Sequence, residues 1–215
     1  MNKRKKFTRM IPDDVRVEDL TIDDITCGAT KCGEGFHCYS KEKTSLRKFG
    51  TERACKECGV ELIDWDRVHL NDVNDSEFVF QEMKSEIIRH LFWHTPIEDD
   101  AIVEAFRRGR TGTKERAHKL LRQRIGKFNS FMDGRQTPMG KDEIVNYAQH
   151  ATATCCRKCL KAWHNIDLEV PLSDEQLNFC TDLVLKYIDL RVPHLTEHPV
   201  EENTIYSILD EHYRH

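Results

Sequence analysis

The sequence predicts a mainly α-helical single domain with short β-strands beside its metal ligands, stapled by zinc in the manner of a zinc ribbon or treble clef. Two observations predict this class. Two Cys-x-x-Cys pairs, Cys55/Cys58 and Cys156/Cys159, lie far apart in the chain, and apolar residues recur at helical spacing between and after them. One zinc ion held by both pairs would close the chain around an inserted helical segment at residues 75–127.

The composition fits a well-solvated protein of the cytoplasm. The chain has 215 residues, of which 39% are hydrophobic and 33% are charged. It is long enough to bury a core, and no apolar run approaches the length of a membrane span. No apolar signal core follows the basic start. Nine cysteines in such a protein indicate metal or redox chemistry before disulfides. We expect no membrane partner.

The chain divides into three expected parts. Residues 1–26 form a polar lead-in, disordered at its start. Residues 27–192 form the zinc-stabilised domain, and residues 193–215 form a tail with a short helix. Within the domain, the glycine-rich residues 27–38 form a loop, and residues 39–54 are basic and irregular. Residues 55–70 read as a zinc knuckle that runs into a short strand.

Three helices are expected in the inserted segment. The first begins near Asp75 or Ser76 and ends at Thr95. Thr95, followed by Pro96 and Glu98, has the pattern of a capping box for the second helix. That helix stops near Gly109, and Thr113 caps a third, basic helix.

The remainder of the domain contributes one more long helix. Residues 128–154 are irregular, with a short strand at residues 145–148. Ser173 and Gln176 form a second capping box, and a strongly amphipathic helix follows until Pro193.

The two Cys-x-x-Cys turns carry the main metal prediction. Tetrahedral zinc takes four ligands, and each turn offers two thiolates to one ion. The turn Cys55-x-x-Cys58 is followed by glycine, which permits its tight bend. Cys156-x-x-Cys159 is the expected second half, although Cys155 can replace Cys156 if the turn is read one residue earlier. The alternative is that one pair is merely buried thiols.

A second cysteine cluster precedes the first knuckle. Cys27, Cys32, His37 and Cys38 lie in a short glycine-rich loop and suggest a second zinc ion. His37 and Cys38 are adjacent, so a remote histidine is an alternative fourth ligand. A flexible cysteine-rich loop without metal is the other interpretation.

Histidines give the candidates for catalysis. Glu86, His90 and His94 fall at i, i+4 and i+8, on one face of the first expected helix. Two histidines at this spacing can chelate a metal, but the acid does not lie between them as it does in metalloprotease helices. Packed, hydrogen-bonded histidines are the alternative.

A few short patches also resemble the HNH nucleases, which have a treble-clef zinc site. That resemblance implies His69 as the base, with Asp66 and His164 holding Mg²⁺ or Mn²⁺ against a phosphate. The chain departs from the pattern because Asp66 and His69 are not adjacent, no asparagine lies convincingly between them, and the helical insert is long. A structural histidine beside Trp163 is the alternative for His164.

Charge is distributed unevenly within a net charge of −4. Residues 107–127, the basic segment, contain one acid, Glu115, whereas the C-terminal part is acidic. The basic residues are Arg107, Arg108, Arg110, Lys114, Arg116, Lys119, Arg122, Arg124 and Lys127. Such a block is typical of a nucleic-acid footprint, of a solvated helix face, or of a surface on which the acidic block docks.

From Cys27 to about Ile188 the chain resembles a family of small, uncharacterised bacterial zinc-binding proteins with a domain of unknown function. The shared strings are CxxCG, DWxRVH at residues 64–69, RHxFWH at 89–94, GRQTP at 134–138 and YAQHATATCCRKC at 147–159, followed by Trp163-His164. The family supplies no activity. It directs attention to its motif histidines, namely His69, His90, His94, His150 and His164.

The leading functional hypothesis is a zinc-binding protein that contacts DNA or RNA through the basic segment, where Lys and Arg would bind phosphates. One alternative is a metal-dependent nuclease or phosphodiesterase, and another is an adaptor whose acidic C-terminal part binds a basic protein. Any chemistry is expected beside the zinc rather than on it, because four thiolates leave no open position.

Overall fold

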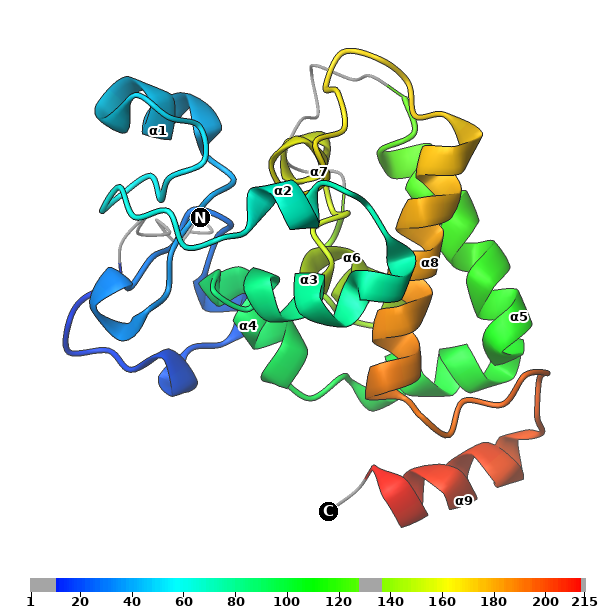
Figure 1. The fold of residues 1–215 in the computed structure, drawn as a ribbon. Coiled ribbons are helices and arrows are strands. Elements are labelled where there is room, and N and C mark those ends of the chain that lie inside the picture. Colours follow the sequence, from blue (N-terminus) through cyan, green and yellow to red (C-terminus); the bar gives the residue numbers. More distant parts are fainter. Residues whose placement is uncertain (1–10, 128–136, 214–215) are drawn as a thin grey trace, which may run out of the picture.

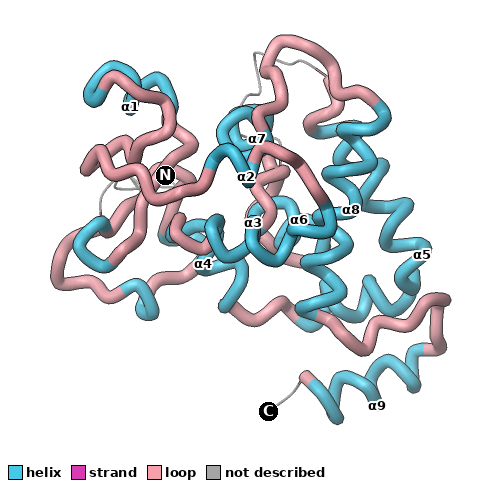
Figure 2. The backbone as a smooth tube through the Cα atoms, viewed as in Figure 1, coloured by secondary structure: helices cyan, strands magenta, loops and turns pink. Residues whose placement is uncertain are grey.

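A computed structural model describes residues 11–127 and 137–213. Helices dominate these residues. An N-terminal part, residues 11–64, is made mostly of loops and lies to one side of the other helices (Figures 1 and 2). The α-helices are α1 (Glu42–Phe49), α2 (Trp65–Val68), α3 (Ser76–Met83), α4 (Ile87–His94), α5 (Asp99–Arg124), α6 (Ile144–Ala151), α7 (Arg157–His164), α8 (Asp174–Arg191) and α9 (Glu202–His212). None of the described helices is both long and apolar enough to span a membrane.

The N-terminal part contains three single 3-10 turns and α1. The turns are η1 (Val17–Asp19), η2 (Ile22–Asp24) and η3 (Cys32–Glu34), and a fourth, η4 (Val73–Asp75), leads into α3. The helix α1 lies in the segment that was expected to be irregular. Gly50 ends it in the left-handed conformation, with φ of 77°.

The helical part packs around α6. Helix α4 lies against α6, and both α5 and α8 pack on α6 and on each other. All eight residues of α6 are buried, including Tyr147. The core continues through Phe92, Phe106, Trp163 and Tyr187 and reaches Ile205 of α9. It also includes Ile11, Val17 and Ile25 of the polar lead-in.

Two expected strands are wrong. Residues 145–148 belong to α6, because a short, mostly apolar run can be a buried helix as readily as a strand, and here helices surround it. Residues 60–64, after the knuckle, form no strand, and α2 follows them with its first turn capped by Asp64, which accepts from the Arg67 amide at 3.1 Å. Within the described residues, β-pairing is limited to the isolated bridges Lys31–Phe36 and His37–Glu86, so a zinc ribbon with regular strands is not seen.

The helix boundaries in the insert also differ from the prediction. The first expected helix is divided into α3 and α4 by an extended residue, Glu86, with φ of −92° and ψ of 129°. Thr95 ends α4 and does not cap the next helix, which begins at Asp99 after Glu98. The predicted helix end near Gly109 is confirmed, because Gly109 is non-helical, with φ of 67° and ψ of 175°, and interrupts α5 there. Thr113, however, lies inside the helical residues that follow. By contrast, the Ser173–Gln176 capping box at the start of α8 is confirmed.

Candidate metal centres

Four donor side chains converge in the N-terminal part, and we call this group centre 1. The sulfurs of Cys32, Cys55 and Cys58 and a ring nitrogen of His37 all lie within 4.8 Å of one another. The Cys32 and Cys55 sulfurs are 3.9 Å apart, and the Cys58 sulfur is 3.4 Å from His37 Nδ1. His37 and Cys55 are buried, while Cys58 is exposed. Three thiols and one imidazole in this arrangement can hold a metal ion.

Two tight loops present these donors. In the first, the amide of Lys31 donates to the Phe36 carbonyl at 2.9 Å, and Gly35 takes φ of 84° to complete the bend. In the second, the Cys55 amide donates to the Val60 carbonyl at 2.8 Å, and Gly59 has φ of 78°. The sequence therefore encodes centre 1 locally, with a glycine in each loop where a side chain would strain the backbone.

Three further cysteines converge where the N-terminal part meets α7, and we call this group centre 2. The sulfurs of Cys27, Cys155 and Cys159 lie within 4.8 Å of one another. Cys156 precedes α7 and interacts with the thiols of Cys155 and Cys159. Centre 2 therefore offers three mutually close thiols, with Cys156 as the adjacent fourth.

A buried arginine faces centre 2. Arg89 of α4 is fully buried, and its Nη2 donates to the Cys159 sulfur at 3.0 Å while its Nη1 lies 3.6 Å from the Cys155 sulfur. The same guanidinium donates to the His150 carbonyl. Hydrogen bonds from neighbouring thiols, led by Cys155, lower the pKa of Cys159 well below its ordinary value, and Arg89 acts in the same direction. A thiolate is the form that binds metal.

Glu86 connects the two parts of the molecule. Its carboxylate is buried and accepts from the Tyr39 amide at 2.8 Å, the Ser40 amide at 3.2 Å and Trp163 Nε1 at 3.1 Å. It also lies 3.4 Å from Arg89 Nε. The carboxylate therefore fastens the loop after His37 onto α4 and α7.

The predicted pairing of the Cys-x-x-Cys turns is wrong. Cys55 and Cys58 converge with Cys32 and His37, whereas Cys159 converges with Cys27 and Cys155. The cause is backbone hydrogen bonding, since the Lys56 amide donates to the Cys38 carbonyl at 3.0 Å and thereby holds the knuckle against the preceding loop. The donors form two groups, but their members differ from those of the two clusters that the sequence suggested.

Cys38 was expected to be a ligand, yet it belongs to neither group among the described residues. Its thiol donates to the Cys27 carbonyl at 3.2 Å and lies 3.6 Å from the Ser40 hydroxyl. Burial raises its pKa to about 12, which keeps it a thiol.

The residues expected for HNH-like chemistry contact the protein itself. Asp66 is on the surface and pairs with Arg53 at 3.0 Å. His69 Nε2 lies 3.1 Å from the Ala162 carbonyl, and the buried His164 has Nε2 3.0 Å from the Thr152 carbonyl. Burial lowers the pKa of His164 to about 4. These contacts suit neutral histidines that fasten α2 and α7, and neither metal group among the described residues includes them.

The other candidate histidines do not share a site with Glu86. Because the helix breaks at Glu86, its carboxylate points into the core while His94 is exposed. His94 Nδ1 bonds to the His90 carbonyl at 2.7 Å, and Phe36 packs on the His90 ring. His150 stacks on Phe92, with centroids 4.8 Å apart, and its Nε2 lies 3.0 Å from the Pro138 carbonyl.

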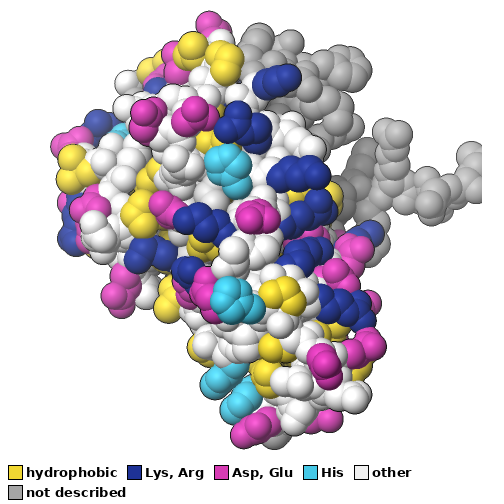
Figure 3. All heavy atoms as spheres, turned by 90° about the vertical axis from the view of Figure 1, so that its right-hand side faces the viewer, with side chains coloured by type: hydrophobic (Ala, Val, Ile, Leu, Met, Phe, Trp, Pro, Cys, Tyr) yellow, Lys and Arg dark blue, Asp and Glu magenta, His cyan; other side chains and the backbone are white. Residues whose placement is uncertain are grey.

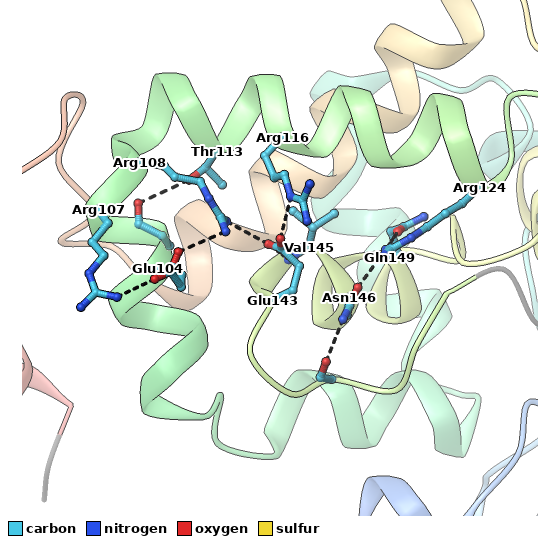
Figure 4. Close-up of polar contacts among 12 residues, drawn as sticks. Glu104, Arg107, Arg108, Thr113, Arg116, Arg124, Glu143, Val145, Asn146 and Gln149 are labelled. Carbon is cyan, nitrogen blue, oxygen red and sulfur yellow. Dashed lines mark hydrogen bonds and ion pairs between the residues drawn. The ribbon is translucent and has the colours of Figure 1, made fainter.

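Acidic side chains accompany the basic segment along α5. Arg110 forms two hydrogen bonds of 2.8 Å with Asp189, and Arg122 pairs with Asp174 at 3.0 Å, both on α8. Glu143 lies between Arg108 and Arg116, at 3.1 and 2.8 Å (Figure 4). The remaining pairs are Arg107 with Glu104 and Glu202, Arg108 also with Glu104, Lys114 with Asp182, and Arg124 with the side-chain oxygens of Asn146 and Gln149.

The side of the molecule on which α5 lies shows the same mixture. Dark-blue Lys and Arg side chains are interspersed with magenta acidic ones (Figure 3). The docking of basic on acidic segments, one of three interpretations of the sequence, is what these contacts show. The helix also carries exposed Lys119.

The fold and the donor groups define a mainly helical protein with two sites that can hold metal ions. Residues 77–189 match the model of a family described as a domain of unknown function, DUF4186. This match covers more than half of the chain, and the chain belongs to this family. No solved structure matches the chain. Cys155, Cys156 and Cys159 lie inside the matched residues, whereas Cys27 and all of centre 1 precede them.

Sequence reasoning missed two parts of the site. It did not single out Arg89, although this residue lies in the RHxFWH string, because nothing in a sequence shows that a guanidinium is buried against thiols. It also left Cys27 without Cys155, since these residues are brought together only by the tertiary fold. The adjacency of Cys155 and Cys156 was the one available indication that the second cluster was more than a simple Cys-x-x-Cys turn.

Proposed function

We propose that this protein binds two zinc ions, one that orders its N-terminal part and one that fastens this part to the helical domain of its family. The observation that carries the proposal is the convergence of Cys32, His37, Cys55 and Cys58 within 4.8 Å. With Zn–S bonds of about 2.3 Å and Zn–N bonds of about 2.0 Å, a tetrahedral site separates two sulfurs by about 3.8 Å and a sulfur from a nitrogen by about 3.6 Å. The separations of 3.9 and 3.4 Å in centre 1 match these values.

The donor chemistry favours zinc over harder cations. Thiolates and imidazole suit zinc, whereas Mg²⁺ and Mn²⁺ prefer carboxylate and water oxygens. Four protein donors fill a tetrahedral shell, which supports a structural role for centre 1. Such an ion supplies folding free energy to a loop-rich segment with little regular structure.

In centre 2, the proposal is supported by three close thiols and by a buried arginine that donates to two of them. Cys27, Cys155 and Cys159 would be ligands, and Cys156 is the fourth donor that a small side-chain adjustment would bring into reach. Arg89 would offset the negative charge of several thiolates on one Zn²⁺, because its guanidinium already donates to two of their sulfurs. Free cysteines in this number suit a reducing compartment, in keeping with the cytoplasmic location that the sequence predicts.

The ion pairs of the basic segment support a role in holding α5 to α8 and to Glu143. A nucleic-acid footprint would require these arginines to exchange their carboxylate partners for phosphates. We therefore place the metal-binding function first and nucleic-acid contact second. The nuclease hypothesis draws no support from the contacts of Asp66, His69 and His164 described above.

Metal analysis of the purified full chain tests the proposal. Native mass spectrometry combined with elemental analysis should find two zinc ions per chain, and Cys32→Ser should retain one. Cys38→Ser is the matched control, because Cys38 is a buried cysteine near both centres and should leave both ions in place. A wild-type protein without zinc, or a Cys32→Ser variant with the full complement, would contradict the proposal.

A further inference from the structure

A cavity of about 880 Å³ lies beside the two centres, and Cys27 of centre 2 is among the residues that line it. Its walls come from the lead-in around Ile22–Gly28, from α1, from the knuckle residues Lys56 and Glu57, and from Thr137–Met139. Ligand pockets typically enclose roughly 300–1,000 Å³, so this cavity is large enough for a molecule of nucleotide size.

Cations outnumber acids in its walls. The four basic residues that line it are Lys41, Arg47, Lys48 and Lys56, and the two acidic ones are Asp23 and Glu57. Glu57 is shared, because its carboxylate lies 3.2 Å from the ammonium of Lys56 and 3.8 Å from that of Lys48. The single negative charge of Glu57 is therefore shared between two lysine ammonium groups.

The other two cations have no acidic partner among the described residues. Lys41 stands immediately before α1, and Arg47 lies one and a half turns along that helix. Both are exposed toward solvent or cavity. The side chains of Lys41 and Lys56 both approach Gly28. If residue 28 had a Cβ atom, that atom would lie 3.3 Å from the Cε of Lys41 and 3.9 Å from the Cε of Lys56. The absence of a side chain at Gly28 leaves room between these ammonium groups and the loop.

The remaining lining is apolar or hydroxylic. Ile22, Ile25 and Met139 give it an apolar surface, and Thr26, Thr44 and Thr137 add hydroxyl groups. His150 lines the cavity as well, beside Phe92 on which its ring stacks. A ligand that suits these walls carries a concentrated negative charge at one end and an apolar or planar body at the other.

We propose that this cavity binds a small phosphorylated molecule with a planar or apolar body, of the size of a mononucleotide. The phosphate contacts Lys41, Arg47 and Lys56, because lysines neutralise phosphate as point charges and arginine offers it paired N–H donors. The body of the ligand lies against Ile22, Ile25 and Met139. This inference goes beyond zinc binding. The cations that hold the phosphate lie in or near α1 and precede the residues matched by the family model, whereas Met139 lies within those residues.

Isothermal titration of the full, zinc-containing protein tests the inference. The probes are AMP and inorganic pyrophosphate, and succinate serves as a dicarboxylate without phosphorus. Saturable binding of AMP or pyrophosphate that exceeds succinate binding supports the proposal. No binding of either phosphate compound, or succinate binding of equal strength, overturns it.

Variants then locate the site. Lys41→Ala combined with Arg47→Ala removes two cations that have no acidic partner among the described residues, so folding should be preserved. Charged hydrogen bonds to the phosphate are lost, so affinity should fall at least about tenfold. Lys43→Ala is the matched control, because Lys43 is exposed on the same helix and does not line the cavity. Unchanged affinity in the double variant overturns the assignment. Zinc content measured on the same samples distinguishes this failure from a failure of the metal centres.

Discussion

The N-terminal part, residues 11–64, and the helical part, residues 77–189, are stabilised in different ways. The helical part buries long apolar side chains of α4, α5, α6 and α8 against one another. The N-terminal part has single turns, one short helix and loops joined by backbone hydrogen bonds. It concentrates donors instead, with all of centre 1 and Cys27 of centre 2. On the proposal of two zinc ions, the first region depends on its ions for order and the second on its packing.

The junction between the two regions is polar and buried. Glu86 and Arg89 lie at the start of α4 and reach the loop after His37, α7 and the centre 2 thiols. A buried charged network of this kind is costly when it loses a member, because the remaining groups are left without partners. The junction should therefore be more sensitive to single substitutions than the surface of either region.

Metal removal should separate the two regions most clearly. On treatment with a strong chelator, hydrogen exchange in residues 27–60 should rise toward that of an unfolded chain, while α8 retains its protection. Zinc binding in small structural sites contributes on the order of 10 kcal/mol, far more than the loops of this region can supply. Retention of full protection in residues 27–60 without metal would show that the ions are not what orders this region.

Arg89→Met should be the most destabilising single substitution at the junction. It removes the donors to Cys155, Cys159 and the His150 carbonyl and leaves Glu86 buried without its cation. The free energy of unfolding in urea should fall by about 3–5 kcal/mol. The control is Arg53→Ala, whose ion pair with Asp66 is exposed and should matter by less than about 1 kcal/mol. Equal effects of the two substitutions would remove the distinction between junction and surface.

Acid should weaken the helical part through its buried histidines. Burial lowers the pKa of His164 from its ordinary 6.5 to about 4. Between these pH values the unfolded chain takes up a proton that the native protein does not, so stability falls as the pH falls from 6.5 toward 4. His164→Gln should lessen this loss by on the order of 1–2 kcal/mol between pH 7 and pH 5.

Urea unfolding of both proteins at several pH values measures this difference, and His94→Gln, at an exposed histidine, is the control. Zinc release contributes to both proteins alike. A parallel pH dependence in wild type and His164→Gln would contradict the assignment of a neutral, buried His164.

The pairing of α5 with α8 should show the smallest effect. The side chains of Arg110 and Asp189 are 37% and 40% exposed, so solvent screens their two hydrogen bonds. A double-mutant cycle of Arg110→Ala and Asp189→Ala should give a coupling of about 0.2–1 kcal/mol. No coupling, together with a loss of salt-sensitive nucleic-acid binding in Arg110→Ala, would favour the footprint hypothesis for the basic segment instead.

The sequence predicted local features better than convergent ones. The helix after Ser173 and its capping box could be predicted because both depend on residues within one turn. The break at Glu86 could not, because α3 and α4 carry apolar residues on both sides of it and only the contacts with Tyr39, Ser40 and Trp163 favour an extended residue there.

The metal donors illustrate the same limit. Cysteine spacing identified the side chains that converge, including Cys32, His37, Cys55 and Cys58, but spacing cannot decide which turns share a centre. That choice depends on the hydrogen bond from Lys56 to Cys38 and on the position of α7 against Cys27. Arg89 lies in the RHxFWH string, which drew attention for its histidines His90 and His94. Its complete burial, which the sequence does not reveal, is what separates Arg89 from these two residues.

The zinc content of a double variant tests the central claim most directly. If Cys55 and Cys159 belong to separate centres, Cys55→Ser and Cys159→Ser should each lose one ion. The protein with both substitutions should then lose both, as measured by native mass spectrometry. If the two cysteines instead shared one ion, the double variant would lose no more zinc than either single variant, and the division into two centres would be contradicted.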